Sequence, residues 1–199
     1  MEDIAMVADT FRVGWEEWAS LPDLGLPALK VKVDTGARTS ALHAFDIEPF
    51  GPAEAPKVRF DIHPIPGRDD VSITCSARII DRREVTSSNG EAEWRFVIGT
   101  DIEMGDHRWP IEITLTDRGS MSNRMLLGRQ ALRDDMLITP SARFCQPELS
   151  FDVYHTAAMT EAAPTRALRI CVLSREPDSY STRRLVEEAA PLLRAGEQH

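Results

Sequence analysis

The sequence contains little cysteine and no recognisable metal-ligand motif. Only Cys75, Cys145 and Cys171 occur among 199 residues, widely separated and without a Cys-x-x-Cys pair. This excludes a disulfide framework and a thiolate zinc site. There is no His-Glu-x-x-His helix motif, and the histidines at 43, 63, 107 and 155 do not share a ligand spacing. We therefore expect reduced, packed cysteines, no metal and no cofactor.

Positive charge is also in short supply. The 23 Lys and Arg residues face 32 Asp and Glu residues, a net charge of −9. This argues against binding nucleic acid or an anionic membrane surface, and an acidic ligand would need a local basic pocket. The first 15 residues contain neither a basic region nor a long apolar run, so we expect no signal peptide, no membrane span and a cytoplasmic location. The composition, 42% apolar and 28% charged, is that of a globular protein with a sizeable core.

Most of the sequence up to about residue 154 indicates short strands separated by turns. Extended runs occur at 30–33, 58–64, 72–81, 91–98 and 136–140. Gly105-Asp106 predicts a hairpin reversal within 101–117, whereas a helix is indicated only over 130–136 (QALRDDM). Many short strands with brief helices favour an all-β fold, a small closed or half-closed β-barrel.

The composition changes after residue 154. Residues 155–167 are small, polar and proline-containing, as in a linker, and 168–199 predict a strand followed by a helix. A single strand and helix cannot bury their own apolar faces. We therefore expect a domain over 1–154, a linker, and a C-terminal βα fragment that opens a larger domain or docks on the barrel or on a partner.

The segment KVKVDTGARTSALH (30–43) places a carboxylate, Asp34, at the end of an alternating strand. With Gly36 two residues later, Asp34 can simply form a turn, because Asp side chains bond nearby amides and glycine permits a positive φ. The same carboxylate, held rigidly at the mouth of a barrel, can also perform acid–base chemistry. This segment alone leaves both interpretations open.

A second segment favours the chemical interpretation. Asp-Thr-Gly-Ala at 34–37, followed by MLLGRQAL at 125–132, resembles the aspartic peptidases of the retroviral type, although 92 residues between Gly36 and Gly128 imply insertions. Residues 11–150 more closely resemble a bacterial family named ATP-dependent zinc proteases, which are retropepsin-like proteins associated with RimK-type glutamate ligases. The resemblance is carried by the stretches WASLPDLGLPALKVKVDTGARTSALHAFDIEPF, DRREVTSSNG, WPIEITLTDR and RMLLGRQAL.

This resemblance implies a retropepsin-like closed barrel in which Asp34 is the catalytic carboxylate. Thr35 would brace the loop, Gly36 would allow close backbone approach and Ala37 would pack behind it. Hydrolysis by carboxylates needs two of them, so the single Asp-Thr-Gly implies a homodimer in which each copy supplies one Asp34. If the copies pair differently, a one-carboxylate site supported by basic residues remains.

The resemblance also suggests a partner. The stretch LRICVLSREPDSYSTRRLVEEA, within 168–199, resembles the first strand and helix of a RimK-type ATP-grasp ligase, as a fused domain or a functional partner, although no ATP site is present. The family name mentions zinc, but the residues give no zinc site.

Arg38 follows the Asp34 loop directly, where a cation can stabilise an ionised carboxylate and hold an acidic substrate. Further basic residues would contribute if they face the same cleft: Lys30, Lys32, Arg82, Arg83, Arg124 and Arg129. The turn TSSNG (86–90) is either a flap or a plain hairpin turn. The residues we expect to bind substrate are Ala37, Arg38, Ser87, Ser88, Asn89 and Arg129.

The first hypothesis is therefore a peptidase that trims glutamate-rich tails made by a RimK-type ligase. The alternative is a non-catalytic module that recognises acidic tails, and a third is a metalloprotease. Structural roles compete at several positions: an ion pair for Arg38, an anchor for the barrel at Arg129, packing for His43, and a solvated face for Arg82 and Arg83.

Overall fold

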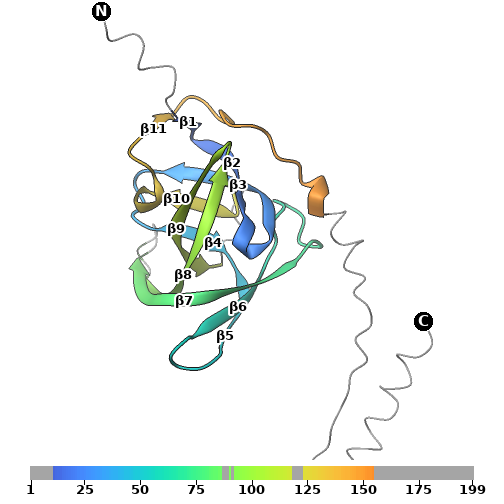
Figure 1. Cartoon of the computed structure of the whole chain (residues 1–199), viewed down its shortest axis with the longest axis vertical. Helices are drawn as coiled ribbons and strands as arrows, with labels where there is room; N and C mark the ends of the chain where they lie inside the picture. Colours follow the sequence, from blue (N-terminus) through green and yellow to red (C-terminus); the bar gives the residue numbers. More distant parts are fainter. Residues whose placement is uncertain (1–10, 87–89, 91, 118–122, 155–199) are drawn as a thin grey trace, which may run out of the picture. The chain divides into compact units, whose positions relative to one another are not determined.

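The computed structural model describes residues 11–86, 90, 92–117 and 123–154 (Figure 1). The predictions for 155–167 and 168–199, and for the side chains of Ser87, Ser88 and Asn89, concern residues outside these ranges. No helix among the described residues is long and apolar enough to cross a membrane.

The described residues form an all-β fold, as predicted. Nine strands make one sheet in the order β2-β3-β10-β4-β9-β8-β7-β6-β5, and an additional pairing of β2 with β8 closes six of them into a barrel. A separate parallel pair joins β1 to β11. The strands are β1 (Phe11–Gly14), β2 (Glu16–Leu21), β3 (Leu26–Asp34), β4 (Ser40–His43), β5 (Phe45–Phe50), β6 (Lys57–Ile62), β7 (Ile73–Thr86), β8 (Ala92–Met104), β9 (His107–Thr116), β10 (Met125–Gly128) and β11 (Met136–Thr139).

The two sequence motifs meet because β10 lies between β3 and β4. It runs parallel to β3, with Gly128 beside Asp34, and antiparallel to β4, with Leu126 beside Ala41. The chain leaves β3 at Asp34, turns through residues 35–39 and enters β4 on the other side of β10. The loop that contains the Asp-Thr-Gly sequence is therefore wrapped around the end of the strand that contains the Leu-Leu-Gly sequence.

The interior of the barrel is apolar. Val31, Leu42, Ile98, Ile113 and Leu127 are fully buried and belong to one contiguous core. Each alternates along its strand with residues of the other face, the period of two that a β-strand imposes. Burial of such side chains contributes about 1.5–3 kcal/mol each, so this core holds the strand ends near Asp34 in a fixed geometry.

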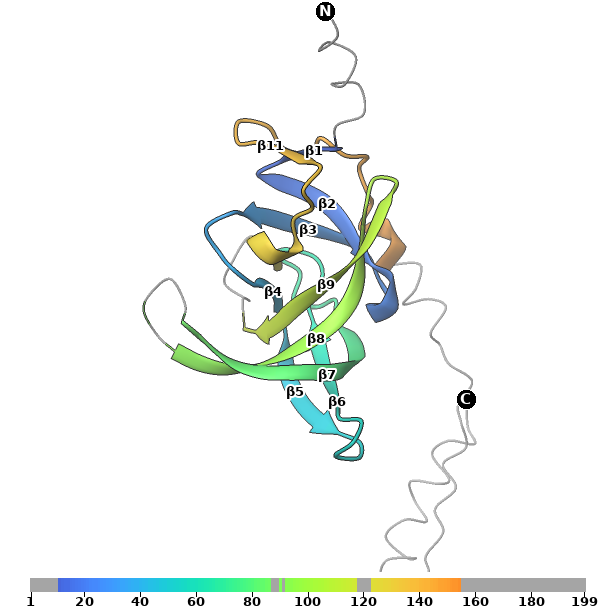
Figure 2. The ribbon, with the colours of Figure 1, turned by 60° about the vertical axis from the view of Figure 1, so that its left-hand side comes forward.

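The longest elements are β7 and β8, of 14 and 13 residues, which pair antiparallel as far as Thr86 and Ala92. They run beyond the end of β9, as Figure 2 shows. The next reversal, between β8 and β9, lies at Gly105, whose φ of 61° is in the left-handed region, and this confirms the predicted hairpin.

The prediction of a helix over 130–136 is wrong beyond the first helical turn. Only Arg129–Ala131 is helical, as a 3-10 turn (η3), and Leu132 is already extended. A longer helix is excluded because Met136 begins β11 and pairs with Phe11. Tertiary strand pairing has therefore overridden the local helix preference.

Cys75 and Cys145 are free thiols. Cys75 is buried, and desolvation raises the pKa of its thiol to about 12. It is a packed, unreactive residue, as the sequence predicted. Cys171 lies outside the described residues.

Candidate active site at the Asp34 loop

Asp34 ends β3 with its side chain half-buried, at the start of the loop. Its Oδ1 accepts hydrogen bonds from the amide groups of Gly36 (3.0 Å) and Ala37 (3.1 Å). These are the local bonds that a turn-forming aspartate makes. Within the described part of the chain, Oδ2 accepts no hydrogen bond, so one carboxylate oxygen is fixed and the other is available to water or substrate.

Three hydrogen bonds from Arg129 and Gln130 hold the loop in place. The Arg129 side chain donates to the Thr35 carbonyl oxygen (2.8 Å), and the Arg129 amide donates to the Ala37 carbonyl oxygen (2.8 Å). The Gln130 amide donates to the carbonyl oxygen of Arg38 (3.0 Å). These bonds give Arg129 the anchoring role considered from the sequence, and they hold the backbone that presents Asp34.

Ser40 is a second brace, which the sequence did not reveal. Its Oγ accepts a hydrogen bond from the Gly128 amide (3.1 Å), and its carbonyl oxygen accepts one from Thr114 Oγ1 (2.8 Å). Ser40 thereby connects β10 and β9 at the point where the loop ends. No local pattern could have identified it, because Gly128 and Thr114 are 88 and 74 residues away along the chain.

The other residues predicted for the loop lie around Asp34. Ala37 is half-buried, Arg38 is exposed, and no ion pair of Arg38 is found within the described residues. Thr35 is also exposed, and no hydrogen bond of its hydroxyl is found within the described residues. In the single chain, the bracing expected from Thr35 comes from Ser40 and Arg129 instead.

Several basic residues considered for the cleft are engaged elsewhere. Lys30 Nζ lies over the rings of Trp18, Phe144 and Phe151, 5.0–5.8 Å from their centroids. The buried side chain of Arg124 donates to Asp69 Oδ1 (2.9 Å). Neither therefore adds to the charge beside Asp34.

Arg82 lies on the face of the sheet opposite to that of Asp34. Its guanidinium stacks on Trp94 and Phe96, 5.6 and 5.7 Å from their ring centroids. Arg83, the next residue on β7, points to the opposite face of the strand, because successive side chains alternate. The sequence suggests one solvated face for Arg82 and Arg83, but the two side chains lie on opposite faces of β7.

An apolar strip lies on the face of the sheet that carries Asp34. Leu126 pairs with Ala41, Ala41 with Thr114, and Thr114 with Val97, so these four side chains cross β10, β4, β9 and β8 in one row. The row is two residues along β10 from Gly128, the partner of Asp34, and therefore on the same face. Ala41, Val97 and Leu126 are buried but do not belong to the core inside the barrel. We call this row of four buried side chains the outer row.

His43 is buried, and its ring lies 5.5 Å from that of His63. No group of three or more His, Cys, Asp or Glu residues able to hold a metal occurs in the described ranges. His43 is a packed residue, as expected.

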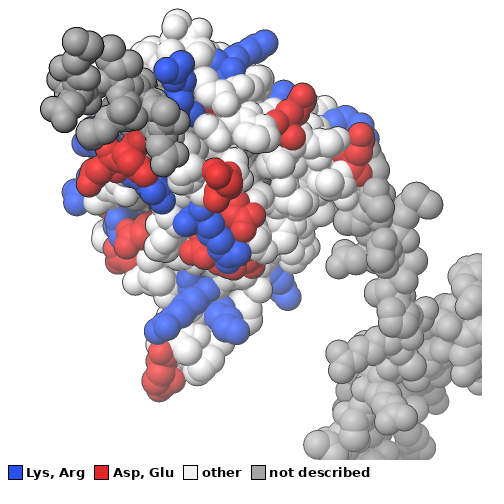
Figure 3. All heavy atoms as spheres, turned by 45° about the horizontal axis from the view of Figure 1, so that its top comes forward, with Lys and Arg blue, Asp and Glu red and all other residues white. Residues whose placement is uncertain are grey.

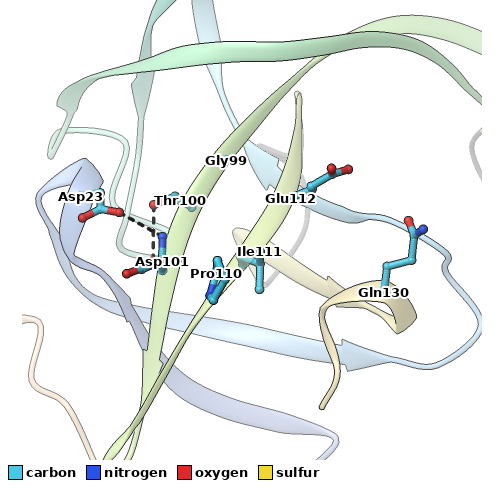
Figure 4. Close-up of a pocket in the computed structure, with 8 residues that line it drawn as sticks. All are labelled: Asp23, Gly99, Thr100, Asp101, Pro110, Ile111, Glu112 and Gln130. Carbon is cyan, nitrogen blue, oxygen red and sulfur yellow. Dashed lines mark hydrogen bonds between the residues drawn. The ribbon is translucent and has the colours of Figure 1, made fainter. Parts of the chain in front are cut away.

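A groove of about 620 Å³ lies on the outer side of β8 and β9 (Figure 4). Three of its lining residues are acidic, Asp23, Asp101 and Glu112, and Asp23 accepts a hydrogen bond from the Asp101 amide (3.0 Å). Gln130, on its edge, connects it to the Asp34 loop through the bond to Arg38. Its acidic lining makes it unsuitable for an acidic chain.

On the face drawn in Figure 3, Lys and Arg side chains are interspersed with Asp and Glu side chains. An acidic ligand bound on this face would therefore be recognised by particular residues and not by a broad basic field.

Comparison with known proteins agrees with this geometry. A family model described as RimB-like, the retropepsin-like aspartic endopeptidase RimB, matches residues 12–149. Its description mentions neither zinc nor ATP. A solved structure from Legionella pneumophila, the protein Lpg0085 of unknown function, has a TM-score of 0.57 and 27% sequence identity, over 68% of this chain and 97% of that chain.

Longer relatives have a different name. Proteins called "Probable alpha-L-glutamate ligase" from Shewanella halifaxensis and Parasynechococcus marenigrum are each 42% identical to this chain, over 97% and 88% of its length. The chain spans only 41% and 38% of those proteins. The match to residues 12–149, together with the Asp34 loop braced by Gly128 and Arg129, shows that the chain belongs to the RimB-like family of retropepsin-like aspartic endopeptidases.

Proposed function

We propose that this chain is an aspartic-type peptidase that hydrolyses peptide bonds in glutamate-rich chains, with Asp34 as its catalytic carboxylate. The observation that carries the proposal is the asymmetry of the Asp34 carboxylate. Loop amides hold Oδ1, while within the described residues Oδ2 accepts no hydrogen bond. A turn-forming aspartate does not require the further bracing of its loop by Ser40 and Arg129.

The chemistry needs two carboxylates that share one proton. One removes a proton from water while the other protonates the carbonyl oxygen of the scissile bond, because adjacent like charges cannot both ionise. Since each chain contains one Asp-Thr-Gly sequence, two copies would form a symmetric site in which each contributes an Asp34. Thr35, exposed in the single chain, would then lie near the interface between the two copies.

The substrate class is inferred from two independent features. Relatives that extend beyond this chain are named as glutamate ligases, which connects the family with chains of glutamate. Arg38, for which no ion pair is found among the described residues, places a cation four residues from Asp34. A RimK-type ligase, fused or separate, is the partner that would supply such a substrate, in the cytoplasm.

One observation favours the alternative of a non-catalytic acidic-tail recognition module. The bonds of Asp34 to Gly36 and Ala37 are also those of a simple turn. In that case Arg38 would be the residue on which binding depends, and Asp34 would be replaceable.

Cleavage of an oligo-glutamate peptide and of a mixed peptide library, by the wild type and by Asp34→Asn, tests the proposal. The asparagine keeps an oxygen for the loop amides but cannot act as an acid or base. We expect chelator-resistant cleavage by the wild type, none by Asp34→Asn, and unchanged thermal unfolding.

Two controls separate the alternatives. Mixing inactive Asp34→Asn with wild type should lower activity per wild-type chain if each site needs a carboxylate from both copies. Cleavage that survives in Asp34→Asn, or binding that depends on Arg38 without any cleavage by the wild type, contradicts the proposal and supports the recognition module. Loss of wild-type activity with a chelator supports the metalloprotease instead.

A further inference from the structure

Two arginines, Arg83 on β7 and Arg95 on β8, lie directly opposite each other in the register of the long hairpin. Directly opposite residues in an antiparallel pair have their side chains on the same face, and like charges there are destabilising. The pair therefore needs compensating negative charge, which Asp81, Glu112 and Glu93 supply.

The register places both arginines beside the outer row. Val97, the last residue of that row, pairs with Asp81, and Arg95 and Arg83 lie two residues further along β8 and β7. Side chains two residues apart on a strand share a face. Arg83 and Arg95 are therefore on the same face of the sheet as the outer row and Asp34.

The guanidinium group of Arg83 is occupied by two of the protein's own carboxylates. Its Nε donates to Asp81 Oδ2 (2.8 Å) and its Nη2 donates to Glu112 Oε2 (3.0 Å). The bond to Glu112 spans from β7 across β8 to β9. With 30% of the Arg83 side chain exposed, a carboxylate that arrives from solvent can reach it.

Arg95 is engaged in a similar way but is more deeply placed. Its Nε donates to Glu93 Oε1, and the same oxygen accepts a hydrogen bond from Thr116 Oγ1 (2.7 Å). Only 10% of the Arg95 side chain is exposed. The bond from Thr116, and then the charge of Arg95, lower the pKa of the Glu93 carboxyl. Glu93 is therefore ionised at neutral pH and compensates Arg95.

We propose that Arg83 and Arg95 bind carboxylate side chains of a glutamate-rich substrate, and that Glu112 and Glu93 occupy these positions in the free protein. The substrate class rests on the proposed function. An extended chain presents every second side chain on one face, so two of its glutamates can approach two arginines on one face of the hairpin. The guanidinium group is suited to this exchange, because its planar N–H groups can donate to one carboxylate or another in the same geometry.

The internal carboxylates give the proposal a distinctive signature. If Glu112 competes with substrate for Arg83, its removal should strengthen binding, whereas removal of Arg83 should weaken it. A purely structural ion pair behaves differently, since loss of either partner disturbs the same contact and neither loss improves binding.

Arg82 supplies a matched control for charge. It precedes Arg83 on β7 and carries the same charge, but its guanidinium stacks on Trp94 and Phe96 on the opposite face. A general electrostatic attraction of acidic peptides would respond equally to Arg82→Gln and Arg83→Gln. A specific site responds only to Arg83→Gln.

The experiment measures binding of an oligo-glutamate peptide, and of an oligo-glutamine peptide of equal length, to the full chain with the substitution Asp34→Asn. This background leaves the peptide uncut. We expect Arg83→Gln to raise Kd for oligo-glutamate roughly ten-fold, the loss of one charged hydrogen-bonding partner, while Arg82→Gln leaves it unchanged. We expect Glu112→Gln and Glu93→Gln each to lower Kd for oligo-glutamate and to leave the weak binding of oligo-glutamine unchanged.

Arg95→Gln is less suitable as the main test, because a substitution at a nearly buried arginine can impair folding; Glu93→Gln examines the same position without removing the arginine. Equal effects of Arg82→Gln and Arg83→Gln, or weaker binding in Glu112→Gln, would overturn the inference.

The expected pattern of Kd values without cleavage by the wild type would uphold the two arginine sites and contradict the peptidase. Cleavage of oligo-glutamate by the wild type, with Kd values insensitive to Arg83→Gln, would uphold the peptidase and contradict the two arginine sites.

Discussion

The backbones of Gly128 and Thr39 touch: a Cβ placed on Gly128 would lie 2.5 Å from the carbonyl carbon of Thr39 and 2.6 Å from its oxygen. No real side chain tolerates such distances, and both neighbours are backbone atoms that cannot rotate away. Glycine at 128 is therefore required for close approach, since its φ of −81° would suit any residue. This contact seats the Asp34 loop against β10.

We predict that Gly128→Ala destabilises the protein by about 1–3 kcal/mol, the usual effect of overpacking, and lowers activity beyond what the loss of folded protein explains. The added methyl group must push the loop at Thr39 away from β10, and the loop carries Asp34 with it. Urea unfolding measures the first effect. Cleavage per folded molecule measures the second.

Gly99→Ala is the matched control. Its added Cβ would meet Ile80 Cδ1 at 3.7 Å, an ordinary van der Waals contact, and Gly99 also lies within a strand. Stability should be unchanged or slightly higher, because alanine restricts the unfolded chain. If Gly128→Ala were as stable as Gly99→Ala, the close approach would not constrain the loop.

Strands with a simple sequence pattern could be predicted from the sequence. β3 alternates from Lys30 to Val33, and the β8–β9 hairpin is marked by Gly105. β2 was not predicted, because all six of its residues are buried, including Glu16 and Glu17, and it shows no alternation. A strand that lacks a period of two gives no local signal. β5 alternates only over residues 45–48 and then contains Pro49, a residue that disfavours strands.

Some residues of the candidate site could likewise be predicted from the sequence, and others could not. Asp34, Gly36, Gly128 and Arg129 follow from motifs that the chain retains in full. Ser40 could not be predicted as a brace, because its partners are set by the β4–β10–β9 register and not by neighbours in sequence. The same holds for the arginines: the sequence supplied the charges, but only the strand pairing decides which of them share a face with Asp34.

Glu17 is a buried carboxylate that fastens the chain on both sides of β2. Its Oε1 accepts hydrogen bonds from the amides of Gly14 (2.6 Å) and Cys145 (2.8 Å), and its Oε2 accepts one from the amide of Gln146 (3.2 Å). The side chain is fully buried. The segment around Cys145 is thereby held against the chain that leads into β2.

We predict that Glu17→Gln destabilises the protein by about 2–3 kcal/mol. The glutamine has nearly the same shape, but it replaces a charged acceptor by a neutral one and turns an NH₂ group toward amide donors. Chemical denaturation should show a lower midpoint with an unchanged slope. Glu148→Gln, at an exposed position nearby, is the control and should behave like the wild type; a Glu17→Gln variant of equal stability would mean that these bonds contribute little.

His43 makes the stability depend on pH. Desolvation, and then the positive charge of Arg124, lower the pKa of His43 below its ordinary value of 6.5, while Asp117 and Asp69 oppose this in part and His63 adds to it. In the folded protein His43 is therefore neutral at pH values where the unfolded chain is already protonated. Its contribution to stability is fully present above about pH 6.5, and it is lost as the pH falls below 6.5 through the depressed folded pKa.

We predict that the free energy of unfolding falls between pH 7 and pH 5, and that His43→Gln reduces this slope although it lowers stability at pH 7. Glutamine cannot take up a proton, so the unfolded state no longer gains one at this position. Urea titrations at a series of pH values, for the wild type and His43→Gln, give both slopes. Equal slopes would assign the acid sensitivity to other groups. A steeper slope in His43→Gln would mean that the folded protein prefers a charged His43, which would contradict the effect of its burial beside Arg124.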